Sequence, residues 1–600
     1  MSNQKPNKPS PTGPIPRPPT SRPVVSGTRG IISSGHWLTS MAGMRMMLSG
    51  GNAFDAVAAG VFAGVVVEPT AACSLAAESV FMLYDARSGD LKSLSGQGVS
   101  PNKATLEFYR SNGLDDVPTG PGPLAPLSFT VPGVVHATIS MLERYGTKSL
   151  GEVLGPAIQY AEEGVPHYRQ MIDFLGLEPT IRQFRLFPPG GVEVFYDDGK
   201  LPQEGSLFYQ PGLAGTLRSL AAAEESSVGS RSEGLRAGID EFYRGRVGRL
   251  IADASESVGG LLGYEDLGAY RSQFEEPLRT TFSGYEICGQ RTWSQAGVLL
   301  QTLNMLEHFD LRAMGHNTPA YIHTVVEALK LSMADRQTFY GDPDFADAPV
   351  EELMSKEYGA ARAALIDPGR AFGELPPPGE PWSGAVPPER LTTEGVPTAG
   401  LGGKPGQAGG TTHVAAIDKA GNMACATPSG GSFEKSVFFP ELGCAISTRS
   451  EMFNLAAGHP NVIEPGKRPR TTLVNYIAVR DGVPQMTFGC PGGDHQTQAN
   501  LQLMLNTFIF GMNPQEAIEA PRFATDSAPD SFYPHNYYPG RLSLEAGIQA
   551  STAGTLEEMG HKTVRADVCG VGATVTHRDP ESGLLSTGGD PRRPCYALSW

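Results

Sequence analysis

Apolar residues in the first two thirds of the chain recur mostly three and four positions apart, the spacing that places them on one face of a helix. Loops rich in glycine and proline separate these segments, for example at 117–126 and 187–199. We therefore predict mainly helices before residue 370. The predicted helices are 52–67, 135–145, 149–163, 212–225, 241–254, 299–307 and 319–339.

From residue 411 onward the pattern changes to the alternation of apolar and polar residues that is typical of strands. Residues 411–417 alternate, a turn-forming run follows at 418–422, and a second alternating run begins at Met423. This order predicts a β-hairpin. The predicted strands are 411–417, 423–427, 474–480 and 485–489, and helices are predicted again at 497–510 and 513–520.

Two segments lack any periodic pattern. Residues 1–24 are rich in proline, serine and lysine without an apolar core, which predicts a disordered tail and not a secretory signal. Residues 370–410 are rich in proline and glycine and predict a flexible arm, for which an ordinary interdomain linker is the alternative. We expect 25–369 and 411–600 to form the two parts of one domain.

Composition excludes several classes of protein. The 600 residues carry a formal net charge of -16, which gives no electrostatic support for nucleic-acid binding. The apolar run 56–67 is too short to span a bilayer and predicts a buried helix. The seven cysteines are widely spaced without a CxxC motif, which argues against a disulfide framework or a thiolate zinc site, and we expect most of them to be buried.

The junction between the arm and the hairpin carries the candidate chemistry. Gly409 and Gly410 precede Thr411 directly. A threonine hydroxyl is a weak nucleophile that needs an adjacent base, and cleavage of the bond between Gly410 and Thr411 would create one, because the freed α-amine has a pKa of about 8. This predicts self-cleavage followed by catalysis at Thr411. A threonine that merely begins a strand after a glycine turn is the structural alternative.

Motifs along most of the chain resemble those of the γ-glutamyltransferase family of N-terminal nucleophile hydrolases. The likeness runs from about Gly27 to the end, and it implies an α+β fold, a four-layer αββα sandwich, with no cofactor and no metal. The motifs are Gly50-Gly51-Asn52-Ala53-Phe54-Asp55-Ala56, Val67-Glu68-Pro69, Val131-Pro132-Gly133, Tyr340-Gly341-Asp342-Pro343, Thr411-Thr412-His413, Pro491-Gly492-Gly493, Ala520-Pro521-Arg522-Phe523 and Gly589-Asp590-Pro591-Arg592.

The resemblance also implies roles for individual residues. The backbone N–H groups of Gly492 and Gly493 correspond to those that stabilise the oxyanion in the family. A second hydroxyl beside the nucleophile corresponds to Ser429, with Thr427 in reserve. Thr471 and Thr472 match a pair of substrate-contacting hydroxyls, although both are equally compatible with the start of a strand.

Two departures from the family pattern affect specificity. Gln97 stands near the position where γ-glutamyl enzymes hold the substrate α-carboxylate with an arginine, and the neighbouring Val99 is also uncharged. Arg449 stands where the family has a neutral contact. We therefore expect γ-glutamyl specificity to be lost, and Arg449 either to bind a negatively charged acyl group or to pair with Glu451 or another acid.

Taken with the resemblance, the sequence predicts a self-processing threonine amidohydrolase or acylase that works through an acyl-Thr411 intermediate. The expected partners are a small-molecule amide substrate and the large and small subunits cut from one precursor, which could assemble further as a homo-oligomer. A γ-glutamyl transpeptidase or glutathione hydrolase is one alternative, and a non-catalytic binding protein on the same fold is another. Because no secretion signal is evident, we expect a cytoplasmic protein.

Overall fold

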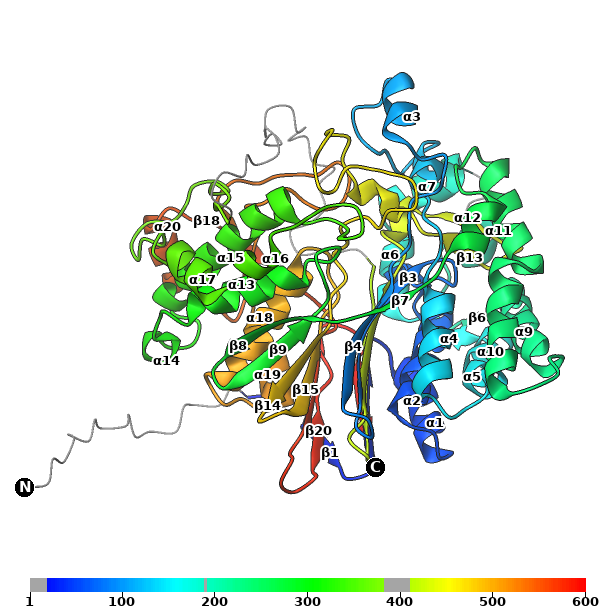
Figure 1. Cartoon of the computed structure of the whole chain (residues 1–600), viewed down its shortest axis with the longest axis horizontal. Coiled ribbons are helices and arrows are strands. Elements are labelled where there is room, and N and C mark those ends of the chain that lie inside the picture. The colour runs from blue at the N-terminus through cyan, green and yellow to red at the C-terminus, as the bar shows by residue number, and fades with distance from the viewer. Residues whose placement is uncertain (1–18, 188–190, 382–409) are drawn as a thin grey trace, which may run out of the picture.

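Two seven-stranded sheets lie face to face at the centre of the molecule, and helices cover the outer face of each (Figure 1). The computed structural model describes residues 19–187, 191–381 and 410–600. Most of the predicted tail and arm, 1–18 and 382–409, therefore lies outside the described residues.

The first sheet, which we call the nucleophile sheet, interleaves strands from both sides of residue 410. Its neighbouring strands are all antiparallel. Strands β10 and β11 form the predicted hairpin and lie between β2 and β3, so the two parts of the chain share one sheet. In spatial order the strands are β21 (Tyr596–Ser599), β2 (Gly30–Ser34), β10 (Val414–Asp418), β11 (Met423–Ser429), β3 (Glu78–Asp85), β4 (Asp90–Gly96) and β7 (Gln273–Glu275).

The second sheet is also antiparallel and packs against the inner face of the first. Apolar side chains from both sheets, such as Ile31 and Ile417 on one and Ile477 and Leu585 on the other, form the core between them. In spatial order the strands are β1 (Val25–Gly27), β20 (Leu585–Thr587), β19 (Thr574–Arg578), β15 (Val483–Gly489), β14 (Tyr476–Arg480), β9 (Tyr285–Gly289) and β8 (Leu278–Phe282).

Helix α2 (Ala53–Val67) packs on the outer face of the nucleophile sheet, and every one of its residues is buried. Asn52 caps its first turn together with Asp55, which explains why the motif around these residues begins a helix. The burial confirms that the apolar run 56–67 is a core helix. The other helices on this side are α1 (Trp37–Leu48), α4 (Val134–Tyr145), α5 (Leu150–Glu163), α9 (Pro211–Glu225) and α10 (Arg231–Tyr243).

Helix α13 (Ala296–Leu306) packs on the outer face of the second sheet and is followed outward by α15 (Pro319–Phe339). The remaining helices on this side are α17 (Lys356–Ala363), α18 (His495–Phe508), α19 (Pro514–Glu519) and α20 (Ala550–Glu558). The four-layer αββα prediction is therefore confirmed.

Shorter elements connect and cover these layers. They are the helices α3 (Leu106–Ser111), α6 (Arg169–Leu175), α7 (Glu178–Leu186), α8 (Val192–Phe195), α11 (Arg246–Ser257), α12 (Tyr264–Ala269), α14 (Leu311–Met314) and α16 (Val350–Leu353), the 3-10 turns η1 (Pro69–Ala71), η2 (Ala125–Ser128), η3 (Phe433–Lys435) and η4 (Arg449–Met452), and the strands β5 (Val165–Pro166), β6 (Leu207–Phe208), β12 (Val437–Phe439), β13 (Cys444–Ile446), β16 (Phe523–Thr525), β17 (Arg541–Glu545) and β18 (Lys562–Ala566).

Two sequence predictions of secondary structure were wrong. The expected helix 241–254 is divided between α10 and α11, because Gly245 is extended and caps the start of α11. The strands of the first two thirds were missed, among them β2 and most of β3. Because these strands are almost wholly buried, they show no alternation, and a short apolar run cannot be told from a helix by its period.

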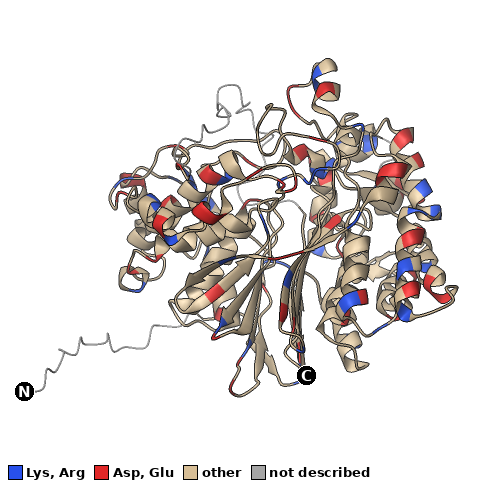
Figure 2. Ribbon diagram, in the orientation of Figure 1, with Lys and Arg blue, Asp and Glu red and all other residues tan. Residues whose placement is uncertain are grey.

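Charged residues gather on the outer helices and on the loops, whereas the strands are mostly uncharged (Figure 2). All seven cysteines are free and buried, as most were predicted to be. No helix in the described part of the chain is long and apolar enough to cross a membrane.

Candidate active site

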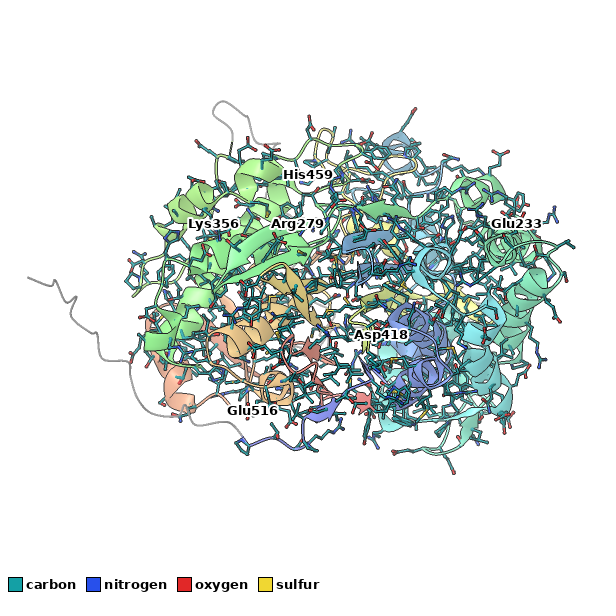
Figure 3. All side chains as sticks on the ribbon, turned by 60° about the horizontal axis from the view of Figure 1, so that its bottom comes forward. Glu233, Arg279, Lys356, Asp418, His459 and Glu516 are labelled. Atoms are coloured by element: carbon teal, nitrogen blue, oxygen red, sulfur yellow. The ribbon has the colours of Figure 1, made fainter. Side chains whose placement is uncertain are left out.

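Thr411 lies three residues before β10, at one end of the nucleophile sheet. Thr411 is only 1% exposed to solvent. The hairpin that follows is fixed at its far end by Asp418, whose carboxylate accepts hydrogen bonds from Asn422 in the turn and from the backbone N–H of Ala53 at the start of α2 (2.9 Å). Figure 3 shows Asp418 beside this helix. At the near end, the N–H of Thr412 donates to the carbonyl oxygen of Pro428 (3.2 Å) and the N–H of Gly35 donates to that of His413 (3.1 Å), so both ends of β10 are held.

The hydroxyls of Thr411 and Ser429 both lie beside the carbonyl group of Gly410. The Thr411 Oγ1 contacts the carbonyl oxygen of Gly410. The Ser429 Oγ, at the end of β11, lies 3.5 Å from the same carbonyl oxygen. Thr427, the reserve candidate, instead donates to Asn475 Oδ1 (2.6 Å). Of the two candidate hydroxyls, Ser429 is therefore the one beside the bond between Gly410 and Thr411.

Glu68 approaches the same place from the end of α2. Its Oε1 accepts a hydrogen bond from Thr412 Oγ1 (2.8 Å), and its Oε2 accepts one from Thr39 Oγ1 (3.0 Å). Burial raises the pKa of Glu68 to about 7, although these hydrogen bonds and the charge of Arg593 act in the opposite direction. This carboxyl group is thus poised between its charged and neutral forms near neutral pH.

Arg593 completes what we call the nucleophile corner, defined as Thr411, Glu68, Ser429 and Arg593. Its Nη1 donates to the backbone carbonyl oxygen of Thr411 (2.6 Å), and the residue is 5% exposed. Its Nε has no hydrogen-bond partner among the described residues. The corner therefore holds one buried cation, one titratable acid and two hydroxyls along the segment Gly410–Thr412.

The predicted oxyanion turn follows β15. Gly492 and Gly493 both have positive φ values, 127° and 55°, which only glycine adopts without strain. Within the described part of the chain, neither backbone N–H donates to an acceptor. Gly572 packs between Pro491 and Arg593, which brings the turn toward the nucleophile corner. The turn thus presents free donors of the kind that stabilise an oxyanion.

Thr471 and Thr472 lie next to this turn. The Nε2 of Gln295 donates to the carbonyl oxygens of both Thr472 (2.9 Å) and Gly493 (3.1 Å), which ties the two segments together. The Thr472 hydroxyl is buried without a hydrogen-bond partner among the described residues, whereas Thr471 Oγ1 accepts from the N–H of Leu473 (3.4 Å). Of the pair, Thr472 is the hydroxyl left free for a ligand.

Arg449 is fully buried, and its nearest acid is Glu78 (3.7 Å between Nε and Oε2). Glu451, the first partner considered from the sequence, instead binds Lys435 (2.8 Å). Arg449 lies on the η4 turn two residues before Glu451, so the two side chains diverge. Glu78 is thus the acid that the scaffold alternative requires, while Arg449 Nε and Nη2 have no hydrogen-bond partner among the described residues.

Gln97 is 1% exposed and lines a cavity of about 40 Å³ together with Tyr270 and Arg468. Its Nε2 reaches only the adjacent carbonyl of Gly98 (3.3 Å). The structure thus places Gln97 beside a small cavity that already contains the arginine Arg468, paired with Asp342. No interaction joins Gln97 to Thr411 in the described part of the chain.

One group of metal-ligating side chains lies elsewhere, on α15 and before β18. We call His323, Glu327, Lys330 and His561 the α15 cluster. His323 Nδ1 and His561 Nε2 are 2.9 Å apart, and His323 Nε2 faces the carbonyl of Asp367 (2.7 Å). The ammonium of Lys330 binds Glu327 Oε1 (2.7 Å). These bonds use the atoms that a metal would need, and Lys330 supplies the cation.

Comparison with known proteins identifies the family. The family model described as Gamma-glutamyltranspeptidase matches residues 39–600, so the chain belongs to the γ-glutamyltranspeptidase family. It is 32% identical to the Acylase ACY 1 proenzyme of Pseudomonas sp. (strain SE83), over 93% of this chain and 92% of that protein. It is 28% identical to the Glutathione hydrolase proenzyme of Escherichia coli (strain K12), over 96% of this chain and 94% of that protein.

Solved structures agree with this assignment. LmbA2991 has a TM-score of 0.89 and 36% identity, and covers 96% of this chain and 99% of its own. The cephalosporin acylase from Bacillus halodurans has a TM-score of 0.82 and 27% identity, and covers 98% of this chain and 99% of its own. The fold and its two interleaved parts are therefore those of the N-terminal nucleophile hydrolases.

Sequence reasoning missed two residues of the nucleophile corner. Glu68 stands in the quoted motif Val67-Glu68-Pro69, but nothing in the sequence places it near Thr411. Arg593 directly follows the quoted motif that ends at Arg592. The adjacent pair Arg592-Arg593 was the signal in the sequence that could have drawn attention to Arg593.

Proposed function

We propose that this chain is a self-processing acylase whose nucleophile is Thr411. The observation that carries the proposal is the contact of the Thr411 hydroxyl with the Gly410 carbonyl in a buried corner, with Ser429 on the same oxygen. Relatives named as proenzymes support maturation from one precursor into two subunits. The acylase names of relatives that match nearly the whole chain support amide cleavage as the reaction.

Maturation follows from this geometry. The Thr411 Oγ attacks the Gly410 carbonyl carbon, and the hydroxyl proton passes to the Thr411 nitrogen as the C–N bond breaks. The product is an ester between Gly410 and the Thr411 Oγ together with a free α-amine. Water then hydrolyses the ester and leaves Gly410 as a carboxylate and Thr411 as a new N-terminus. Ser429 is placed to hydrogen-bond the Gly410 oxygen as it gains negative charge.

Turnover repeats the same steps on a substrate amide. The α-amine of Thr411 takes the hydroxyl proton, and the Oγ attacks the amide carbon. The N–H groups of Gly492 and Gly493 stabilise the oxyanion, which typically contributes about 3 kcal/mol for each donor. The proton passes to the leaving amine, and water cleaves the acyl-Thr411 ester.

The substrate is a small-molecule amide whose acyl group is not γ-glutamyl. Gln97 supplies no cation for a glutamate α-carboxylate, and its cavity is shared with Arg468 and its paired acid. Arg449 is balanced by Glu78, so its charge does not by itself call for an acidic acyl group. A screen of acyl amides should therefore give higher kcat/KM values for its best member than for a γ-glutamyl anilide.

The decisive experiment is the variant Thr411→Ala. Intact-mass measurement of purified wild-type protein should show two chains, the smaller beginning at Thr411, whereas Thr411→Ala should remain one chain without amidase activity. A substrate whose acyl-Thr411 ester hydrolyses slowly should add the mass of its acyl group to the small subunit of the wild type. Full activity in an uncut wild-type chain would overturn the mechanism.

A further inference from the structure

The contact between Arg593 and Thr411 outlasts maturation. Arg593 Nη1 donates to the Thr411 carbonyl oxygen, which stays with Thr411 when the bond on its other side is cut. Both residues then belong to the same small subunit. Because β10, which follows Thr411, and β21, which follows Arg593, both pair with β2 in one sheet, the cut leaves the strands beside this contact in place.

The guanidinium of Arg593 therefore lies close to the future α-amine. Within one residue the backbone nitrogen and carbonyl oxygen are about 3 Å apart, so the amine and the guanidinium are separated by about 6 Å or less. A cation at that distance disfavours a second positive charge and thus favours the neutral amine. The neutral form is the one that can accept the Thr411 hydroxyl proton.

The other titratable groups around Arg593 do not cancel this effect near neutral pH. Glu68 is the one facing carboxyl group, and burial raises its pKa to about 7, so it is largely uncharged below that pH. Asp590 is held by Arg522 (2.8 Å) and by Arg592. The remaining neighbours stay neutral because burial raises the pKa of each: Cys73, Tyr168, Cys490 and Cys595.

We propose that Arg593 is a positioning residue that holds the Thr411 backbone and keeps the mature α-amine unprotonated, with Glu68 acting on the same amine in the opposite direction. This inference rests on the proposed function, because it requires Thr411 to be an N-terminus. It assigns a role to Arg593, which directly follows the motif Gly589–Arg592. It also means that the charge of this corner sets the pKa of the catalytic base.

The test is the acid limb of the pH profile of kcat/KM, which reports the base of the free enzyme. Arg593→Gln keeps a donor for the Thr411 carbonyl and removes the charge. We expect its acid limb to move to higher pH by about one to two units, the shift expected for a unit charge at this distance in a partly polar interior. Arg593→Lys, which keeps the charge, should stay within about half a unit of wild type by the same argument.

A matched control is Arg22→Gln. Arg22 makes the same kind of bond, from its Nη1 to the carbonyl of Cys595 (2.5 Å), but it does not contact Thr411. Its removal should leave the acid limb where it is. An unchanged acid limb in a correctly cut Arg593→Gln enzyme, or an equal shift in Arg22→Gln, would overturn the proposal.

Glu68→Gln should shift the acid limb in the opposite direction. Removal of the carboxylate should move the acid limb slightly to lower pH, since the amine loses a stabilising negative charge. If the acid limb disappears in this variant, the base is Glu68 itself and the proposal is wrong. Should Arg593→Gln fail to mature, Arg593→Met, which also removes the charge, is measured in its place: an acid limb moved up by about one to two units supports the proposal, and an unmoved one overturns it. Mass measurement of the small subunit separates these outcomes from failure of cleavage at Thr411.

Discussion

The nucleophile corner and the α15 cluster are both buried and both rich in titratable groups, yet they are built in opposite ways. In the α15 cluster the ammonium of Lys330 meets Glu327 at 2.7 Å, and His323 and His561 bond each other at 2.9 Å. Opposite charges and donors are paired within the cluster. It also binds the first residues of the predicted arm 370–410, because Glu327 Oε2 accepts the N–H of Phe372 (2.7 Å).

In the nucleophile corner the charges are less completely paired, although its hydrogen bonds are of similar length. The Ser429 hydroxyl lies 3.5 Å from its nearest acceptors, and Arg593 bonds a neutral carbonyl instead of a carboxylate. Burial raises the pKa of Glu68 to about 7, so its charged and neutral forms are both accessible near neutral pH. The comparison teaches that paired buried charges fix the structure, whereas incompletely paired ones remain free to stabilise charge that appears during a reaction.

The largest effect on stability should come from Lys330→Met. This change leaves Glu327 buried without its cation, and breaking a buried pair in this way typically costs about 3–5 kcal/mol of unfolding free energy. Urea unfolding of the variant measures the loss, and its kcat should remain close to wild type. The control is Lys356→Met, labelled in Figure 3, whose partner Glu307 is part-exposed; it should cost less than about 1 kcal/mol. Equal losses of unfolding free energy in both variants would show that burial of the Lys330–Glu327 pair makes no difference, and would contradict the prediction.

Ser429→Ala should behave in the reverse manner. Loss of the hydroxyl beside Gly410 should slow both self-cleavage and kcat/KM by about 10–100-fold, since one donor to developing charge is removed. The urea midpoint should hardly move. Ser436→Ala is the control, because that buried hydroxyl bonds the carbonyl of Ser432 (2.9 Å) and has no contact with Gly410. Wild-type cleavage and turnover rates in Ser429→Ala would show that this hydroxyl is not used.

The smallest effect is the pH dependence of stability that the buried His561 causes. Burial lowers the pKa of His561 to about 3, so the folded protein keeps it neutral while the unfolded chain protonates it below about pH 6.5. The unfolded state then binds more protons, and stability falls as the pH drops from about 6.5 toward 3. His561→Gln should remove about 1 kcal/mol of this dependence for each pH unit in that window. Parallel stability curves for variant and wild type between pH 6 and about 4.5 would contradict it.

How far the sequence reached depended on whether a feature was local. The helix 319–339 and the hairpin turn at Asp418 were predicted correctly, because helical period and turn chemistry are written in neighbouring residues. Thr411 could be proposed as the nucleophile because its glycines adjoin it in the sequence. Glu68 was not, since it lies 344 positions from Thr412, which it binds. The partner of Arg449 was missed for the same reason, because Glu78 becomes its neighbour only through the fold.

Gly410 fits where no other residue could. A Cβ added to it would lie 2.1 Å from the carbonyl carbon of Ala71, so Gly410 packs directly against the backbone of the η1 turn. On the proposed mechanism, Gly410 occupies the position of the substrate acyl group in the precursor and excludes substrate until the bond to Thr411 is cut. Because hydrolysis of the ester is not reversed in water, each molecule matures only once.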